Sequence, residues 1–453
     1  MPRSAKATYS SWLRFWQSGE GRFRDVRGFS SIFWLEVKAL ARSKTLAMLA
    51  FVTVSWMCAF PRIATGDGTA DGARELWIHY SLGGAFVLLV VALLASAAGA
   101  VAHERESNRL SLTVVRPVRY ASVVLARACA LVAAGAAVLA LDCAVLPFSA
   151  RTGWNRVCRH VAAPALPSVR EEARRTLDAF MKDPSTPEAV RKAKPAAVLR
   201  LLENRIADNY LVVRTNATAR WRFMLPRGVT EDLGVRVRLS GHFGVRREVD
   251  GVFRLGDLEG TVSNLTQSLQ TVPLRLPGGG RTASVSLDPA SDVRELSFEN
   301  RGRETVMLRP RKDLELLWPA DAFGWNLFRC YLELVGILAL VVSFGLFLSV
   351  SLSRPVALFV AMVTLAVGEM SPSVIERNPN ELGAGTVDRF GLVMTRLAAE
   401  ITRPVSVLEP ISRLSADTCV EWREVVRVVL FDLLLLPVLF ALLSGWVLPR
   451  KTS

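Results

Sequence analysis

Five ionisable residues lie within or at the edge of the long apolar segments of this 453-residue chain: Asp142, Arg329, Glu333, Glu369 and Asp432. A lone charge is unfavourable inside a bilayer, so such groups pair, line a water-filled path or extend toward the headgroups. Arg329 precedes Glu333 by one helical turn and can pair with it. Two readings stay open: an intramembrane polar pathway for a substrate or protons, or interfacial residues that reach water.

Motifs for nucleotide binding or hydrolysis do not occur in the sequence. It contains no GxxxxGK[ST], GxSxG or HExxH pattern. The six cysteines have no CxxC spacing and the four histidines are scattered, so no metal or cofactor is expected. Cys158 and Cys419 are both expected on the external side of the membrane. In an oxidising compartment, a disulfide between them is an open alternative to two free thiols. We do not expect an enzyme, and any ATP-driven work must come from another polypeptide.

The apolar residues are gathered into blocks of membrane length. A bilayer core of about 30 Å needs about 20 helical residues. The first and fifth blocks are short for this thickness, so flanking residues or local thinning must compensate. We predict an α-helical polytopic membrane protein with six transmembrane helices, at residues 45–60, 85–102, 123–146, 327–350, 355–368 and 425–447.

Charge predicts the orientation of these helices. Residues 1–44 contain nine Lys or Arg and three acids, whereas residues 61–82 contain two Arg and three acids. Lys and Arg favour the cytoplasmic side, so both the N-terminus and the tail, 448–453, are predicted to lie in the cytoplasm. The protein is predicted to lie in the cell membrane, which is the inner membrane if the cell is a diderm bacterium. Residues 147–323 and the loop 369–424 then lie outside. The net charge of +15 partly reflects this topology, and without a basic helix interleaved with aromatics no nucleic-acid partner is expected.

Residues 147–323 are predicted to form an inserted extracytoplasmic α+β domain. Its first part is helical, since Ser168 and Glu171 make a capping-box pattern. From Tyr210 the apolar period changes to two, as in half-buried strands separated by turns. This spacing is typical of an antiparallel β-sandwich. The apolar positions that alternate are Trp221, Phe223 and Leu225; Val235, Val237 and Leu239; Val272, Leu274 and Leu276; Val285 and Leu287; Leu296 and Phe298; Val306 and Leu308.

The lead before the first span contains Phe29, Ile32, Phe33, Leu35 and Leu40 interleaved with charges. This pattern suits an interfacial elbow helix. A cytoplasmic extension of the first span is the alternative for its last turn.

The link between the second and third spans, residues 103–122, is polar and rich in arginine. It contains Glu104-Arg-Glu106, Leu110, Leu112 and Arg116-Pro-Val118-Arg119. With the Leu408-Glu-Pro410 segment before the last span and Pro449-Arg-Lys451 after it, this order of parts resembles the type-2 ABC exporter permeases. In that family the link is a cytoplasmic coupling helix.

The resemblance implies a permease subunit that pairs with a second permease subunit, as a homodimer or heterodimer, among membrane lipids. It also implies docking of a cytoplasmic ABC ATPase subunit, whose ATP hydrolysis moves a substrate outward. A different reading is a membrane-anchored assembly or sensory protein whose external β-domain binds a partner. The coupling residues that the resemblance implies are Glu104, Glu106, Leu110, Leu112, Val115, Arg116 and Pro117.

The predicted topology can be tested with reporter fusions. Fusions after Arg119 and Lys451 should report a cytoplasmic position, and fusions near Gly279 and Pro404 an external one, because the basic segments stay inside. An external signal at Arg119 would overturn both the orientation and the coupling-helix assignment.

Overall fold

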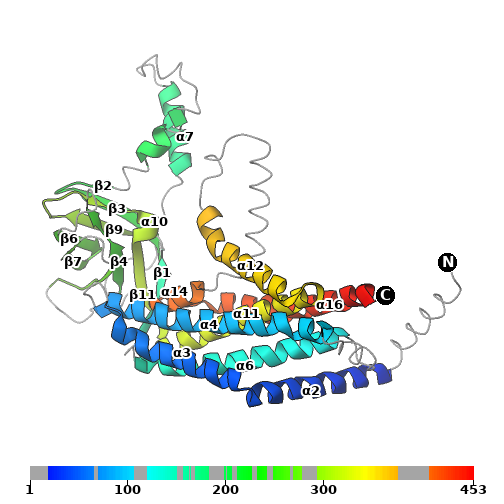
Figure 1. Ribbon diagram of the computed structural model, residues 1–453. Coiled ribbons are helices and arrows are strands. Elements are labelled where there is room, and N and C mark those ends of the chain that lie inside the picture. The colour runs from blue at the N-terminus through cyan, green and yellow to red at the C-terminus, as the bar shows by residue number, and fades with distance from the viewer. Residues whose placement is uncertain are drawn as a thin grey trace.

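The computed structural model shows a bundle of apolar helices with a strand-rich region at one end (Figure 1). It describes residues 19–65, 70–106, 120–149, 157–162, 164, 169–182, 198–199, 201–206, 212–226, 232–241, 248–265, 269–277, 293–375 and 408–452.

Among the described residues, five helical segments are long and apolar enough to cross a membrane, which supports a membrane-embedded protein. A sixth apolar helix, Arg354–Ala366, is shorter, so the predicted span at residues 355–368 is not established by length. The five candidates are Lys44–Ile63, Gly72–Ala100, Tyr120–Ser149, Phe323–Ser351 and Trp422–Val447.

These candidates coincide with helical elements of the bundle or lie within them. Helix α3 follows α2 after a break at Ser43, whose hydroxyl donates to the carbonyl oxygen of Leu40 at 2.7 Å. The last span contains a π-helical turn, η3, between two α-helices. The elements are α2 (Gly19–Arg42), α3 (Lys44–Ile63), α4 (Ala70–Glu106), α6 (Tyr120–Ser149), α11 (Phe323–Ser351), α12 (Arg354–Ile375), α15 (Trp422–Val428), η3 (Val429–Leu435) and α16 (Leu436–Thr452).

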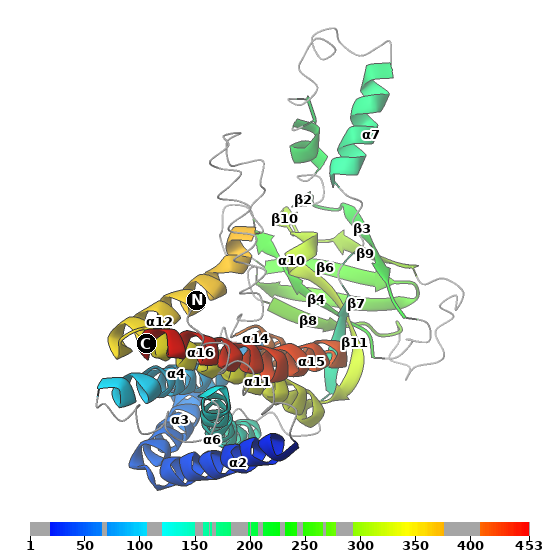
Figure 2. The same cartoon turned by 90° about the vertical axis from the view of Figure 1, so that its right-hand side faces the viewer.

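Helix α11 is the centre of the bundle. In its apolar 18-residue stretch 78% of residues are buried, against 11% in that of α3 and 22% in that of the last span. It packs against α4, α6, α12, α14 (Glu409–Ser415), α15, η3 and α16 (Figure 2). A largely apolar helix is stable in this position because neighbouring helices cover most of its surface.

Glycine lets α11 approach the last span closely. A Cβ atom on Gly336 would lie 2.3 Å from Cγ1 of Val428, the residue directly before η3. Small residues at such contacts allow helix backbones in membranes to come together and gain dispersion energy. Gly336 therefore sets the spacing of these two helices.

The strand-rich region contains three antiparallel sheets. Their strand orders are β1-β11-β4-β8, β2-β10-β5 and β3-β9-β6-β7. A helix, α7 (Val169–Lys182), extends away from them (Figure 1). The strands are β1 (Val157–Ala162), β2 (Val212–Val213), β3 (Thr218–Met224), β4 (Gly234–Arg238), β5 (Ser240–Gly241), β6 (Glu248–Leu255), β7 (Leu258–Leu265), β8 (Leu269–Pro273), β9 (Val293–Asn300), β10 (Val306–Met307) and β11 (Leu314–Ala322).

The period-two pattern identified the inward side chains of several strands. Trp221 and Phe223 of β3 and Leu296 and Phe298 of β9 are buried in one apolar cluster with side chains of the other sheets. Strand β4 departs from simple alternation because it lies between β11 and β8, and its Arg236 is buried as well. Val285 and Leu287 lie outside the described residues.

The strand-rich region is joined to the bundle without a linker on its C-terminal side. Strand β11 ends at Ala322 and α11 begins at Phe323. The same strand pairs with β1 along Val157–Ala162. The central helix of the bundle and a central strand of one sheet are therefore continuous.

Replacing Gly336 should separate α11 from the last span. Gly336→Ala places a methyl group against a stiff β-branched side chain, and we expect a loss of about 1–3 kcal/mol in stability. The measurement is the thermal unfolding midpoint of the purified full-length protein in detergent.

The matched control is Gly83→Ala, whose Cβ would lie 3.4 Å from Leu408, an ordinary contact. It should leave the midpoint unchanged. Equal midpoints for the two variants would show that close approach at Gly336 does not stabilise the bundle.

Candidate functional site

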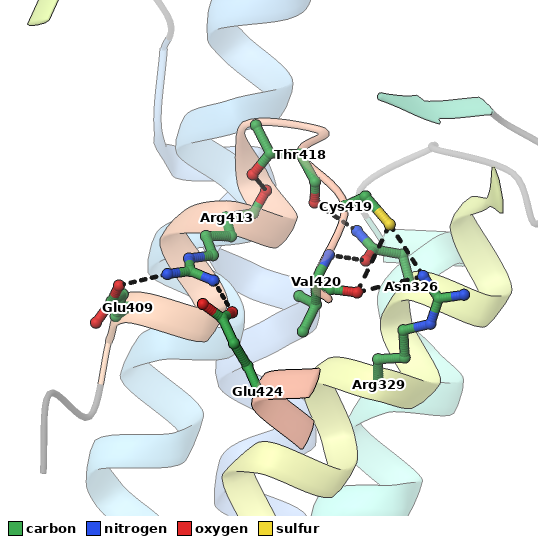
Figure 3. Close-up of polar contacts among 8 residues, drawn as sticks. All are labelled: Asn326, Arg329, Glu409, Arg413, Thr418, Cys419, Val420 and Glu424. Carbon is green, nitrogen blue, oxygen red and sulfur yellow. Dashed lines mark hydrogen bonds and ion pairs between the residues drawn. The ribbon is translucent and has the colours of Figure 1, made fainter. Parts of the chain in front are cut away.

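A network of polar contacts joins α11, α14 and α15 to the segment 416–421, and we call it the polar junction (Figure 3). Two of its residues come from α11, and the others come from α14, the following segment 416–421 and the start of α15. Its members are Asn326, Arg329, Glu409, Arg413, Thr418, Cys419, Val420 and Glu424.

Arg329 is the most engaged cation of the polar junction. It is 7% exposed, and its Nη1 donates to Sγ of Cys419 at 2.9 Å and to the carbonyl oxygen of Val420 at 3.2 Å. Its Nη2 pairs with the carboxylate of Asp321 on β11, and its Cζ lies 5.0 Å from the ring centre of Trp422. The planar guanidinium can make these contacts together because its donors point in several fixed directions.

Asn326, one turn earlier on α11, binds the same segment through its amide. Its Nδ2 donates to the carbonyl oxygen of Thr418 at 2.8 Å, and its Oδ1 accepts from the backbone N–H of Val420 at 2.7 Å. The fully buried side chain thus satisfies two backbone groups that have no strand or helix partner of their own.

Arg413 ties α14 to the last span. Its Nη2 donates to Glu409 at 2.7 Å and its Nη1 pairs with Glu424 on α15. Desolvation acts to lower the pKa of Arg413, but the two carboxylates outweigh it and the pKa is raised. Glu333 on α11 lies within electrostatic range of this pair.

The strands bind the segment 416–421 from the other side. The N–H of Arg159 on β1 donates to the carbonyl oxygen of Asp417 at 2.8 Å, and the N–H of Cys419 donates to the carbonyl oxygen of Arg159 at 2.8 Å. The buried Arg236 of β4 donates to the carbonyl oxygen of Ala416. The segment is therefore held by helices and strands at once.

The predicted pathway residues lie on separate elements of the bundle. Asp142 is on α6, Glu333 on α11 and Asp432 in η3, and among the described residues no hydrogen bond or ion pair joins them. Arg329 pairs with Asp321 rather than with Glu333, because β11 brings that carboxylate to the guanidinium.

The remaining predicted residues have no described side chains. Glu369 lies in α12, and Glu104 and Glu106 lie in the last turn of α4. Leu110, Leu112, Val115, Arg116 and Pro117 fall outside the described residues.

The alternative of a disulfide is not realised, since all six cysteines are free thiols. Cys158 and Cys419 nevertheless lie on neighbouring segments, because β1 bridges the chain at Thr418. Burial raises the pKa of the Cys419 thiol, although the adjacent Arg329 acts to lower it. Cys419 therefore serves the polar junction as a protonated acceptor. Among the described residues no group of three or more metal-ligating side chains is gathered.

No protein-family model, curated protein or solved structure matches this chain. The geometry must therefore carry the functional argument. The polar junction presents no nucleophile beside a general base in the described part of the chain. The segment 416–421 is bonded both to the bundle helices and to strands β1 and β4. This arrangement can transmit movement between the helices and the strands.

Sequence reasoning included Arg329 but missed its neighbour Asn326 in the polar junction and its ion-pair partner Asp321 on β11. The partners of Asn326 lie more than 90 residues away along the chain. The only available signal was chemical: an Asn and an Arg on one face of an otherwise apolar segment need polar partners.

Replacing the guanidinium with an ammonium should loosen this segment. Arg329→Lys keeps the charge but cannot reach Asp321, Cys419 and Val420 together, and a charged hydrogen bond is worth about 1.5–3 kcal/mol. Local opening should then rise about tenfold or more. The measurement is the rate of maleimide labelling at Cys419, resolved by peptide mass spectrometry.

The control is Arg220→Lys, because Arg220 forms an ion pair with Glu295 in which its side chain is 71% exposed. This variant should label at the parental rate. Parental labelling in Arg329→Lys as well would show that the guanidinium does not hold the segment.

Proposed function

We propose that this chain is the membrane-spanning permease subunit of an ATP-driven type-2 ABC exporter. ATP would be hydrolysed by a separate cytoplasmic subunit, and two permease subunits would form the path for a substrate that leaves the cytoplasm. The support is the order of parts in the sequence together with the arrangement of the described helices.

The observation that carries the proposal is the separation of the two ends of the bundle. The end of α4 and the start of α6, which flank the arginine-rich link, lie away from the strands, as does the C-terminal end of α16 (Figure 1). An ATPase that docks at this end would therefore not compete with a partner of the strand-rich region.

The N-terminal helix supports the same reading. Helix α2 packs against α6, where Nε of Arg127 donates to Oε1 of Glu36 at 2.9 Å. Both side chains are largely covered, at 13% and 28% exposed, so the pair is better shielded from solvent than most surface pairs. An ATPase that acted on the link and on α2 would thus move α6 in two ways, through the link that leads into α6 and through α2, which packs against it.

Movement of α4 would then pass to the far end of the bundle. Helix α4 packs against α3, α6, α11 and α14. Helix α14 carries the polar junction residues Glu409 and Arg413. Tilting of α4 would therefore also move the segment 416–421, which binds β1 and β4. In this mechanism the strand-rich region changes position with each ATP-driven cycle, as in rigid-body switching.

The carboxyl groups of Asp142, Glu333 and Asp432 are candidates for lining the substrate path under this proposal. Their burial at 0%, 5% and 2% exposed needs a reason, since isolated acids are unfavourable in a bundle. A chain that only anchored an external domain would have no need of them.

Truncation of the coupling segment separates transport from anchoring. In a Leu110→Ala/Leu112→Ala variant we expect ATPase co-purification to weaken by at least one to two orders of magnitude, since each leucine buried against the ATPase would contribute about 1.5–3 kcal/mol. The measurements are co-purification with the co-expressed ATPase subunit and ATP hydrolysis by the reconstituted complex.

The matched control is Leu434→Ala/Leu435→Ala in the last span, where both side chains are more than half exposed at 54% and 56%. This double variant should retain both the co-purification of the ATPase subunit and the ATP hydrolysis of the complex. Unchanged co-purification and hydrolysis in the Leu110/Leu112 variant would favour a membrane-anchored assembly or sensory protein.

A further inference from the structure

A cavity of about 370 Å³ lies between α3 and α4, and we call it the α3–α4 cavity. It is lined by Trp56 of α3, by residues between His79 and Leu88 of α4, and by Leu408, which precedes α14. These parts of α3 and α4 belong to the membrane-length segments, at the end of the bundle nearest the strands (Figure 1). None of the lining residues is a member of the polar junction or of the coupling segment.

Two glycines of α4 leave room for the α3–α4 cavity. A Cβ atom on Gly84 would lie 2.4 Å from Nε1 of Trp56, so the missing side chain lets the indole lie against α4. The indole N–H donates to the carbonyl oxygen of Tyr80 at 3.1 Å, which holds the ring in place as one wall. On the other side, Gly83 faces Leu408. The walls therefore come from three segments that are separate in the sequence.

The lining changes from polar to apolar along α4. At one end His79 lies 3.5 Å from the hydroxyl of Ser412 on α14. At the other end the lining is Val87 and Leu88. These ends are about 13 Å apart at about 1.5 Å per helical residue. Since none of the described lining residues is Asp, Glu, Lys or Arg, the site suits a slender, uncharged group that continues into a polar one.

Aromatic side chains place the polar end of the α3–α4 cavity at the membrane surface. The ring centroid of Phe60 lies 5.5 Å from that of Trp56 and 5.7 Å from that of Tyr80. Nearby, the indole N–H of Trp77 donates to the carbonyl oxygen of Ala64, just after α3 ends, at 3.1 Å. Trp and Tyr gather where the hydrocarbon meets the lipid headgroups. The apolar end of the cavity then lies deeper, within the hydrocarbon.

The α3–α4 cavity opens toward the surroundings of the bundle. Val87 and Leu88 are 42% and 40% exposed, and α3 buries only Thr53 and Met57 among its own residues. At this depth in a bilayer the surroundings are acyl chains. An empty cavity would forfeit dispersion contacts along its whole lining, which a chain of methylene groups can restore.

We propose that the α3–α4 cavity binds one acyl chain of a membrane phospholipid. The headgroup would lie beside His79, and the chain would pass over Gly83 and Gly84 and end near Val87. Packing against the Trp56 indole and bare helix backbone, rather than the hydrophobic effect, favours this chain over those of the surrounding lipid. The site does not depend on the proposed ATPase partner.

A bound chain would also hold α3 on the bundle. Helix α3 has the lowest buried share of the five candidate spans, at 11% of its apolar stretch. The chain would touch Trp56 of α3, the two glycines of α4 and Leu408 together. It would thus supply packing that the side chains of α3 do not.

Photo-cross-linking of the full-length protein tests the site. The protein is placed in nanodiscs of phosphatidylcholine, a small fraction of which carries a diazirine on one acyl chain, and adducts are mapped by peptide mass spectrometry. We expect the adduct yield at Val87 and Leu88 to be about twofold or more that at Leu434 and Leu435, because a pocket encloses about 70–90% of its ligand. The two reference leucines are more exposed, at 54% and 56%, and line no cavity in the described part of the chain.

A cavity-filling variant and a matched control complete the experiment. Val87→Trp fills the α3–α4 cavity and should lower the adduct yield at Leu88 to that of the reference leucines. Val91→Trp adds the same side chain one turn along α4, at a 37% exposed position outside the cavity, and should keep the parental yield.

If Val87→Trp does not fold, the adduct map of the parent decides alone. Adducts at Val87 and Leu88 no more frequent than at the reference leucines would overturn the proposal, as expected if a second copy of the chain covered the cavity. An unchanged yield at Leu88 in a folded Val87→Trp variant, or an equal loss in Val91→Trp, would overturn it as well.

Discussion

The buried guanidinium of Arg329 sets the relation between the two parts of this molecule. The donors of a guanidinium away from water need acceptors, and the acceptors for Nη1 and Nη2 of Arg329 come from two places. Asp321 belongs to β11, whereas Cys419 and Val420 belong to the segment before the last span. Because β11 continues directly into α11, one side chain orients a strand, a helix and a distant segment.

Packing within the bundle follows a different constraint. Lipid is as apolar as the helix surfaces, so helices associate through close packing and a few polar contacts rather than through the hydrophobic effect. Gly336 allows such an approach at Val428, and the Tyr331 hydroxyl donates to the carbonyl oxygen of Ala136 on α6 at 3.3 Å. Helix α11 is central because it takes part in contacts of both kinds.

The two ends of the bundle are held together by different contacts. At one end α2 and α6 are joined by Glu36 and Arg127, and at the other the polar junction joins the helices to β1 and β4. Helix α4 reaches from the first end of the bundle to α14. In the proposed exporter, α4 would therefore carry movement from one end of the bundle to the other.

Sequence alone determined those properties that depend on a single helix or strand, namely its apolar length and which of its residues face inward. Apolar length identified five membrane-length helices, and period-two alternation identified the inward residues Trp221, Phe223, Leu296 and Phe298. Both signals are local, because a helix or strand facing apolar surroundings repeats its apolar residues along its own length. The fifth predicted span, residues 355–368, is not established by length, since its apolar helix, Arg354–Ala366, is shorter than a membrane span.

Only the tertiary structure decided which polar groups meet. Local spacing favoured Glu333 as the partner of Arg329, but strand β11 delivers Asp321 instead, and Asn326 finds its partners more than 90 residues away. Burial of Arg236 likewise follows from the place of β4 between β11 and β8. Periodicity reports how one element faces its surroundings, whereas ion pairs and shared amides depend on how separate elements dock, which no single stretch of sequence encodes.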